Sequence, residues 1–197
     1  MFAHTAVTGT ILVVDDDPDA LLLLSETLQT KGHVVTLAPT ANQALSSFQS
    51  MIPDLVLLDV LLPDMDGFKV CSYMKAMGAE THVPVIFISG LTDTVDKVKG
   101  FEVGGADFIT KPFAGEEVLA RVAMHLELKR ILKEKDEHNT RLEQQIERYK
   151  AGTGSQQRET ALRFGESELL ATRGVEAYHL EQMAWLREQF AGGGGEK

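Results

Sequence analysis

The chain has 197 residues, of which 44% are hydrophobic and 24% are charged, the composition of a soluble globular protein. Its formal net charge of −10 disfavours non-specific binding to nucleic acid or to anionic membranes, so we expect neither as a partner. The single cysteine, Cys71, excludes an intrachain disulfide, and residues 1–9 lack the basic start and apolar core of a signal peptide. No run reaches the roughly 18 apolar residues that a membrane span needs. We therefore expect a cytoplasmic protein.

Two short apolar runs that end on carboxylates predict buried strands. Residues 10–14 are apolar and largely β-branched, and they stop at Asp15 and Asp16. Residues 55–58 form a second such run, which ends on Asp59. Both runs are too short for a buried helix and fit strands that are covered on both faces. In a parallel sheet the carboxyl ends of the strands border the ligand crevice, so Asp59 is the candidate reactive group.

Helical patterns alternate with strands over the first 125 residues. Asp17 and Pro18 cap and open a helix that should end at Gly32, and Thr40 caps a second helix that should end before Pro53. This alternation predicts an α/β fold with five parallel strands in a doubly wound sheet that is covered on both faces. We expect a flavodoxin-like sheet, the group in which the strand order is 2-1-3-4-5. The remaining helices are expected at 68–77, 94–103 and after Phe113, and the remaining strands at 34–37, 85–89 and 107–109.

This strand order would bring Asp15, Asp16 and Asp59 together in one crevice. Three carboxylates at one point repel one another unless a cation is present, and oxygen ligands in a partly hydrated site favour Mg²⁺. Lys111 follows the last strand and supplies a positive charge, while Ser89 ends the strand at 85–89 and supplies a hydroxyl. The set predicts the handling of a phosphoryl group at a carboxylate nucleophile.

In their order and spacing these residues resemble the receiver domain of two-component response regulators. The resemblance implies that Asp59 is the phosphoacceptor and that a histidine kinase donates the phosphoryl group. It also implies that Mg²⁺ is bound by Asp15, Asp16, Asp59 and the backbone carbonyl of Leu61. The matching motifs lie within about residues 10–125 and are Val14-Asp15-Asp16, Asp59 with Pro63 and Asp66-Gly67, Ser89-Gly90, Gly105-Ala106-Asp107-Phe108 and Lys111-Pro112-Phe113.

The same resemblance assigns the switching residues. Lys111 would bind the phosphoryl group, Ser89 would be the switch hydroxyl, and Phe108 the aromatic side chain that turns into the space Ser89 vacates. The Lys111–Pro112 bond is expected to be cis. Phosphorylation would then shift the population of two arrangements of the surface made by 94–103, 107–109 and the helix after Phe113.

The residues two places after the phosphoacceptor and after the switch hydroxyl are Leu61 and Leu91. In this family these positions affect the approach of hydrolytic water, and neither leucine can orient water by hydrogen bonding. We therefore expect a long-lived phosphoryl group and a signalling switch, not an enzyme. A Mg²⁺-dependent phosphatase is disfavoured, because Leu61 stands where such an enzyme usually has its general acid.

Several other polar residues have simpler interpretations. Asp17 is expected to act as a helix cap, and Asp64 and Asp66 are expected to be loop and turn residues, since the rest of a calcium-binding loop is missing. Cys71 lies in a helical pattern and should be a buried hydrophobe. The six histidines have no metal-site spacing, so no chemistry is assigned to them.

Beyond the receiver, residues 118–150 contain neither glycine nor proline. Lys135 and Asn139 interrupt an otherwise apolar seam that has alternating three- and four-residue steps. This pattern predicts a coiled coil over 126–150, in which Asn139 favours a parallel homodimer of fixed register; a solvated single helix is the alternative. The apolar seam residues are Leu128, Leu132, Leu142, Ile146 and Tyr149.

Residues 151–157 have the composition of a linker, 158–191 are expected to be helical and 192–197 to be a flexible tail. The region after the receiver has too few large apolar residues for an independent enzyme core. We therefore expect a receiver at 10–125 that acts on protein partners through a dimerising helical extension. The alternative is the regulatory receiver of a larger hybrid kinase or cyclase-type enzyme, whose catalytic domain is absent from this chain.

Overall fold

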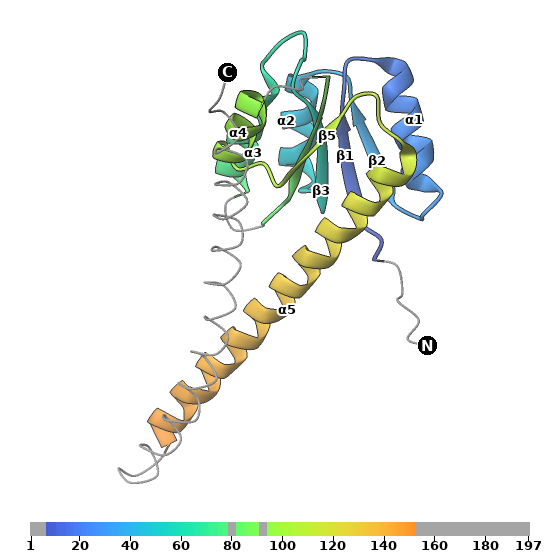
Figure 1. Ribbon diagram of the computed structural model, residues 1–197. Helices are drawn as coiled ribbons and strands as arrows, with labels where there is room; N and C mark the ends of the chain where they lie inside the picture. Colours follow the sequence, from blue (N-terminus) through green and yellow to red (C-terminus); the bar gives the residue numbers. More distant parts are fainter. Residues whose placement is uncertain (1–6, 79–81, 91–93, 153–197) are drawn as a thin grey trace, which may run out of the picture. The chain divides into compact units, whose positions relative to one another are not determined.

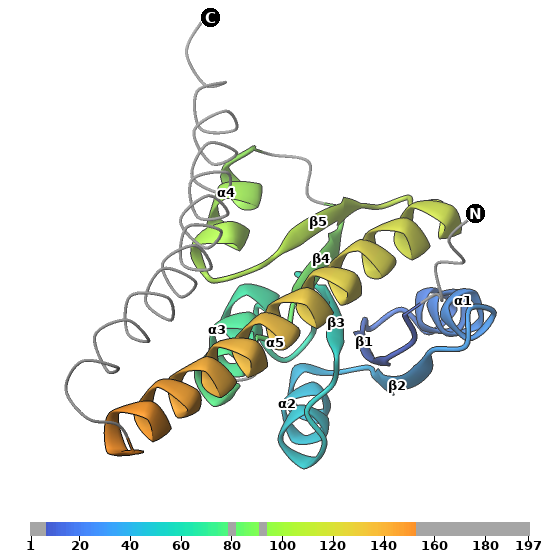
Figure 2. The same ribbon diagram turned by 90° about the horizontal axis from the view of Figure 1, so that it is seen from below.

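The computed structural model describes residues 7–78, 82–90 and 94–152, and the chain divides into two compact units, Met1–Lys129 and Arg130–Lys197. In the first unit five parallel strands form one sheet in the order β2-β1-β3-β4-β5 (Figure 1 and Figure 2), which confirms the predicted topology. The strands are β1 (Thr10–Val14), β2 (Val34–Ala38), β3 (Leu55–Asp59), β4 (Val85–Ser89) and β5 (Asp107–Thr110).

Helices cover both faces of this sheet (Figure 2). The first part of α5 packs with α1 on one face, and α2 and α3 pack on the other. Gly100 of α4 lies against the rings of Phe68 and Phe87, which places α4 on the same face as α3. The helices are α1 (Pro18–Gln29), α2 (Ala41–Ser50), α3 (Gly67–Met77), α4 (Thr94–Glu102) and α5 (Gly115–Gly152).

Successive residues of each central strand enter two separate hydrophobic cores. In β3, Leu55 and Leu57 pack with α1 and α5, whereas Val56 and Leu58 pack with α2 and α3. All four side chains are fully buried, as expected for a parallel strand covered on both faces. Cys71 is buried in the α2 and α3 core, as predicted, and burial raises the pKa of its thiol to about 11. The core therefore fixes the strand ends that carry the polar site.

The start of α1 follows the prediction more closely than its end. Asp17 caps the helix by accepting a hydrogen bond from the Asp19 amide at 2.9 Å. The helix ends at Gln29, three residues before Gly32, which adopts a left-handed φ of 82° in the turn that leads into β2. Gly32 thus forms the turn after the helix, where a side chain would strain the backbone.

Helix α5 begins in the first unit and ends in the second. In the second unit the half-buried positions of α5 are Leu132, Lys135, Asn139, Leu142 and Ile146, five of the expected seam positions. Tyr149, the last expected seam residue, is 59% exposed. Ion pairs join Arg130 to Glu134, Glu137 to Arg141 and Glu147 to Lys150 along the same helix. The coiled coil stays a prediction, and the segments expected within 153–197 lie outside the described residues. Among the described helices, none has a stretch long and apolar enough to cross a lipid bilayer.

Candidate phosphoryl-transfer site

Four strands deliver polar residues to the carboxyl edge of the sheet. Asp15 follows β1, Asp59 is the last residue of β3, Ser89 is the last residue of β4 and Lys111 follows β5. The Lys111 amide donates to the Ser89 carbonyl at 2.9 Å, which ties the ends of β4 and β5 together. Asp15, Asp59 and Ser89 are 1%, 6% and 0% exposed. The fold thus gathers these residues at one nearly enclosed edge.

Lys111 lies between the two buried carboxylates. Its Nζ is 2.6 Å from Oδ2 of Asp15 and 2.5 Å from Oδ2 of Asp59. Burial alone would lower the pKa of Lys111, but the hydrogen bonds to Asp15 and Asp59 outweigh burial and raise this pKa. The Lys111 ammonium group therefore stays charged and can neutralise part of the negative charge at this edge.

The acidic residues also approach one another. Asp15, Asp16 and Asp59 each offer an oxygen atom within 4.8 Å of the others, and of the three only Asp16 is exposed. Burial raises the pKa of Asp15, and the hydrogen bonds from Lys111 and from the Asp17 amide oppose this rise. A set of carboxylate oxygens with one face open to water suits a hard divalent cation.

Leu61 lies directly beside the candidate phosphoacceptor. Its amide donates to Oδ1 of Asp59 at 3.0 Å, and its side chain is 62% exposed. Asp66 caps α3 by accepting from the Phe68 amide at 2.8 Å, in keeping with its expected place in a turn. Leu91, the second residue expected to affect hydrolytic water, lies outside the described residues.

The expected switch aromatic is already packed inward. Phe108 is 8% exposed, and its ring centroid is 5.9 Å from that of Phe87, which in turn is 5.1 Å from that of Phe68. Lys97 Nζ lies 5.8 Å from the Phe108 centroid. The Lys111–Pro112 bond is cis, as expected. The aromatic side chain thus occupies one end of a row of three rings that crosses from α3 to β5.

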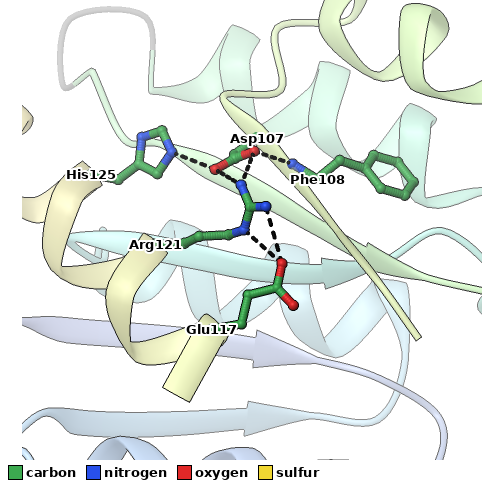
Figure 3. A network of polar contacts seen from close by, with 5 residues as sticks. All are labelled: Asp107, Phe108, Glu117, Arg121 and His125. Carbon is green, nitrogen blue, oxygen red and sulfur yellow. Dashed lines mark hydrogen bonds and ion pairs between the residues drawn. The ribbon is translucent and has the colours of Figure 1, made fainter. Parts of the chain in front are cut away.

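The sequence did not reveal a polar network that joins β5 to α5 (Figure 3). Asp107 accepts hydrogen bonds from Arg121 Nη1 at 2.8 and 2.9 Å and from its neighbour, the Phe108 amide, at 2.7 Å. His125 Nε2 lies 3.1 Å from the same carboxylate, and Glu117 pairs with Arg121 at 3.0 Å. His125, to which no chemistry was assigned, is therefore part of the link between β5 and α5. Glu117, Arg121 and His125 stand at four-residue steps, a spacing that places them on one helix face.

This network should make the stability of the first unit depend on pH. Burial alone would raise the pKa of Asp107, but hydrogen bonds from His125, the Phe108 amide and Arg121 outweigh it and lower this pKa. The stabilisation is therefore present above the pKa of an unfolded aspartate and is lost as the pH falls through the lower folded-state pKa. We expect Asp107→Asn to cost about 2 kcal/mol at pH 7 and progressively less toward pH 3, measured by urea unfolding. Asp136→Asn, an exposed site on α5, is the control, and an equal loss at all pH values would contradict the prediction.

A doubly wound sheet whose carboxyl edge gathers aspartates, a lysine and a serine is the arrangement of a receiver domain. Residues 11–123 match the family described as "Response regulator receiver domain". The match covers more than half of the chain, so the chain belongs to the response regulators, a family of signalling proteins.

Relatives and solved structures agree with this assignment. The chain is similar to the DNA-binding response regulator MtrA of Mycolicibacterium smegmatis, with 41% identity over 116 residues, 59% of this chain and 50% of MtrA. It is 38% identical to the regulator RpaA of Synechocystis over 112 residues, 57% of this chain and 46% of RpaA. The chain thus spans about half the length of these curated relatives.

Two solved structures match over different lengths. The BeF3-activated receiver domain of DrrB has a TM-score of 0.57 and 37% identity, covering 61% of this chain and 99% of that domain. NtrX from Brucella abortus has a TM-score of 0.63 and 30% identity, covering 72% of this chain and 35% of NtrX. Both likenesses support the same fold for the first unit.

The comparisons overturn one prediction. The exclusion of a nucleic-acid partner is wrong, because MtrA is named a DNA-binding response regulator and RpaA a DNA-binding dual master transcriptional regulator. The exclusion relied on the net charge of −10, which bears on non-specific attraction to phosphates. The net charge of a chain does not indicate whether a response regulator acts on DNA.

Proposed function

We propose that this chain is a phosphoaspartate-dependent switch that accepts a phosphoryl group from a histidine kinase on Asp59. The observation that supports this most is the setting of the Asp59 carboxylate. It is 6% exposed, lies 2.5 Å from the Lys111 ammonium and belongs to a cluster of three carboxylates. An aspartate in a simple structural ion pair has a cation of its own, whereas Asp59 shares one ammonium group with a second buried carboxylate, which suits a site completed by a divalent cation.

The proposed chemistry is a single displacement at phosphorus. An Asp59 carboxylate oxygen attacks the phosphorus atom of a phosphohistidine, and the phosphorus–nitrogen bond breaks as the imidazole leaves with the electron pair. Lys111 is placed to pair with a phosphoryl oxygen. Asp15, Asp16, Asp59 and the Leu61 carbonyl would hold Mg²⁺, which neutralises charge on the transferring oxygens. The chain is thus an acceptor with at most slow self-dephosphorylation and not an enzyme that turns over.

The proposed output runs through the α4, β5 and α5 surface. Ser89 would be drawn toward the phosphoryl oxygens, and the new charge would favour the arrangement in which Phe108 stays buried. Asp107, which binds the Phe108 amide and also Arg121, connects this strand to α5. A shift in population at β5 would therefore reach the helix that enters the second unit.

The proposed extension is a parallel coiled-coil dimer over residues 126–150. Support comes from the three- and four-residue spacing of the seam on α5 and from Asn139, whose Oδ1 is shielded from solvent and has no hydrogen-bond partner among the described residues. In a parallel dimer an asparagine at this seam position can pair with its copy. A dimerising switch of this kind would act on protein partners in the cytoplasm.

The test compares the wild type with Asp59→Asn, with Mg²⁺ present, before and after addition of beryllium fluoride. Phosphate uptake from acetyl phosphate and solution mass by light scattering are measured on both proteins. We expect uptake, and a change in mass or in its concentration dependence, in the wild type alone. Equal uptake by both proteins would overturn the assignment of Asp59. The mass of a monomer under all conditions would overturn the coiled-coil dimer. The mass of a dimer under all conditions would mean that phosphorylation changes the geometry of the helices and not the assembly state.

Control of transcription is a second candidate, favoured by the printed names of MtrA and RpaA. The matches extend over 116 and 112 residues, so the regions of these relatives outside the receiver have no counterpart in the alignment. A gel-shift assay on random duplex DNA, with and without beryllium fluoride, tests whether this chain contacts DNA itself. If no DNA is shifted with or without beryllium fluoride, action through a protein partner is the better explanation of the function.

A further inference from the structure

Asp64, a residue expected only to lie in a loop, connects the candidate site to a distant helix. It belongs to the loop between β3 and α3, yet both of its carboxylate oxygens bind the start of α2. Oδ1 accepts from the Ala41 amide at 2.9 Å, and Oδ2 accepts from the Asn42 amide at 3.0 Å. Thr40, the local cap of the same helix, accepts from the Gln43 amide at 3.3 Å. Two side chains from separate segments thus satisfy the first three amides of α2.

The same loop carries the backbone of the candidate site. At its start, the Leu61 amide donates to Asp59 Oδ1 at 3.0 Å. At its end, the Gly67 amide donates to the Val60 carbonyl at 2.9 Å, which closes the loop on itself. Asp64 lies between these ends and joins the loop to another element. The Leu61 amide and the loop ends thus have bonds of their own, and Asp64 is the residue that attaches the middle of the loop to α2.

The two hydrogen bonds between Asp64 and α2 are suited to holding the middle of the loop in place. An anionic side chain at a helix N-terminus is favoured by the unpaired amides and by the helix dipole. The amides of Asn42 and Ala41 lower the pKa of Asp64, so the carboxylate stays ionised near neutral pH. A two-point attachment also fixes the direction of the side chain, which a single hydrogen bond would not.

We propose that Asp64 is a positioning residue that holds the loop on α2 and so preorganises the Leu61 carbonyl for the divalent cation. This inference rests on the proposed function, in which that carbonyl is a Mg²⁺ ligand. Cation binding is then coupled to the capping of α2, because the same loop conformation places Asp64 on α2 and presents the Leu61 carbonyl to the cation. A loop freed from α2 has to be ordered when the cation binds, and the affinity falls by that cost.

The experiment compares Asp64→Ala and Asp64→Asn with Thr40→Ala, titrating each with Mg²⁺ alone and following it by calorimetry. Thr40→Ala is the matched control, because it removes a cap from the same helix and leaves the loop attached. We expect the Mg²⁺ dissociation constant to rise roughly tenfold in Asp64→Ala, the lower end of the range for residues that orient metal ligands. Asp64→Asn keeps one acceptor and should fall between Asp64→Ala and the wild type. Thr40→Ala should match the wild type.

Two further measurements separate positioning from charge and from general destabilisation. Titration in 1 M salt, where the Debye length is about 3 Å, removes the long-range attraction of one more carboxylate. Amide hydrogen exchange should be faster at Leu61 in Asp64→Ala and unchanged there in Thr40→Ala. Unchanged Mg²⁺ affinity and exchange in Asp64→Ala would overturn the inference while leaving the proposed function intact. A wild type that binds no Mg²⁺ would instead overturn the proposed function.

Discussion

Replacing Gly67 with alanine is expected to destabilise the first unit by about 3 kcal/mol or more. A Cβ atom at this position would lie 2.2 Å from the Asp59 carbonyl oxygen and 2.8 Å from the Val60 Cα. Both neighbours are backbone atoms at the end of β3, so neither can rotate away as a side chain could. The chain must shift the end of this strand, which carries the candidate phosphoacceptor, and urea unfolding of Gly67→Ala measures the cost.

Gly90 provides the matched control for this substitution. It follows β4 at the same edge of the sheet, and a Cβ atom there would meet no atom within 4 Å. Gly90→Ala should therefore change the free energy of unfolding by no more than about 0.5 kcal/mol. If the two variants were equally stable, the close approach of Gly67 to Asp59 would not be a constraint of the native fold.

Asp15→Asn is expected to weaken Mg²⁺ binding strongly without weakening the metal-free fold. Outer-shell partners of a metal ligand typically contribute 10- to 100-fold in affinity, and Asp15 is assigned as a direct ligand, so we expect a loss of at least about 100-fold. Asparagine keeps the shape and can still accept from the Asp17 amide, which lies 3.0 Å from Asp15 Oδ1. It removes one of three mutually repelling carboxylates, and Lys111 keeps its pairing with Asp59.

Two measurements check this prediction. Calorimetric titration gives the Mg²⁺ affinity, and thermal unfolding in the presence of a chelator gives the stability, which should be equal to or higher than that of the wild type. Asp17→Asn is the control, because Asp17 is an exposed cap of α1 only two residues away. Equal losses of affinity in both variants would mean that general acidity, and not a defined ligand set, attracts the cation.

The sheet and the ends of its strands could be predicted because the signals are local. Four consecutive apolar residues before Asp59 are too few for a buried helix and fit a central parallel strand that is covered on both faces. The strand order comes from the flavodoxin-like group of doubly wound sheets, and with that order the carboxyl edge collects Asp15, Asp59 and Lys111 without any knowledge of side-chain packing.

The remaining contacts depend on how elements lie against one another. Asp64 reaches α2 across 23 residues of sequence, and nothing near it in the chain indicates the partner. Asp107 contacts Arg121 because α5 packs beside β5, which the local sequence does not indicate. The four-residue spacing of Arg121 and His125 indicates only that these polar side chains share one face of a helix. The prediction that nucleic acid is not a partner was wrong for a different reason. Net charge bears on the non-specific attraction of a protein to phosphate groups and does not identify the target of a regulator.

The charges at the acidic edge of the sheet do not balance without a cation. Three carboxylates and one ammonium carry a formal charge of −2, and a single divalent cation brings that sum to zero. A monovalent cation would neutralise only half of this charge, so the charge balance favours Mg²⁺ over K⁺ as the proposed ion. Protons compete for the same oxygens, because burial raises the pKa of Asp15. If the proposed cation binds here, its occupancy is linked to acidity, and acidification would weaken its binding at the site that phosphoryl transfer would use.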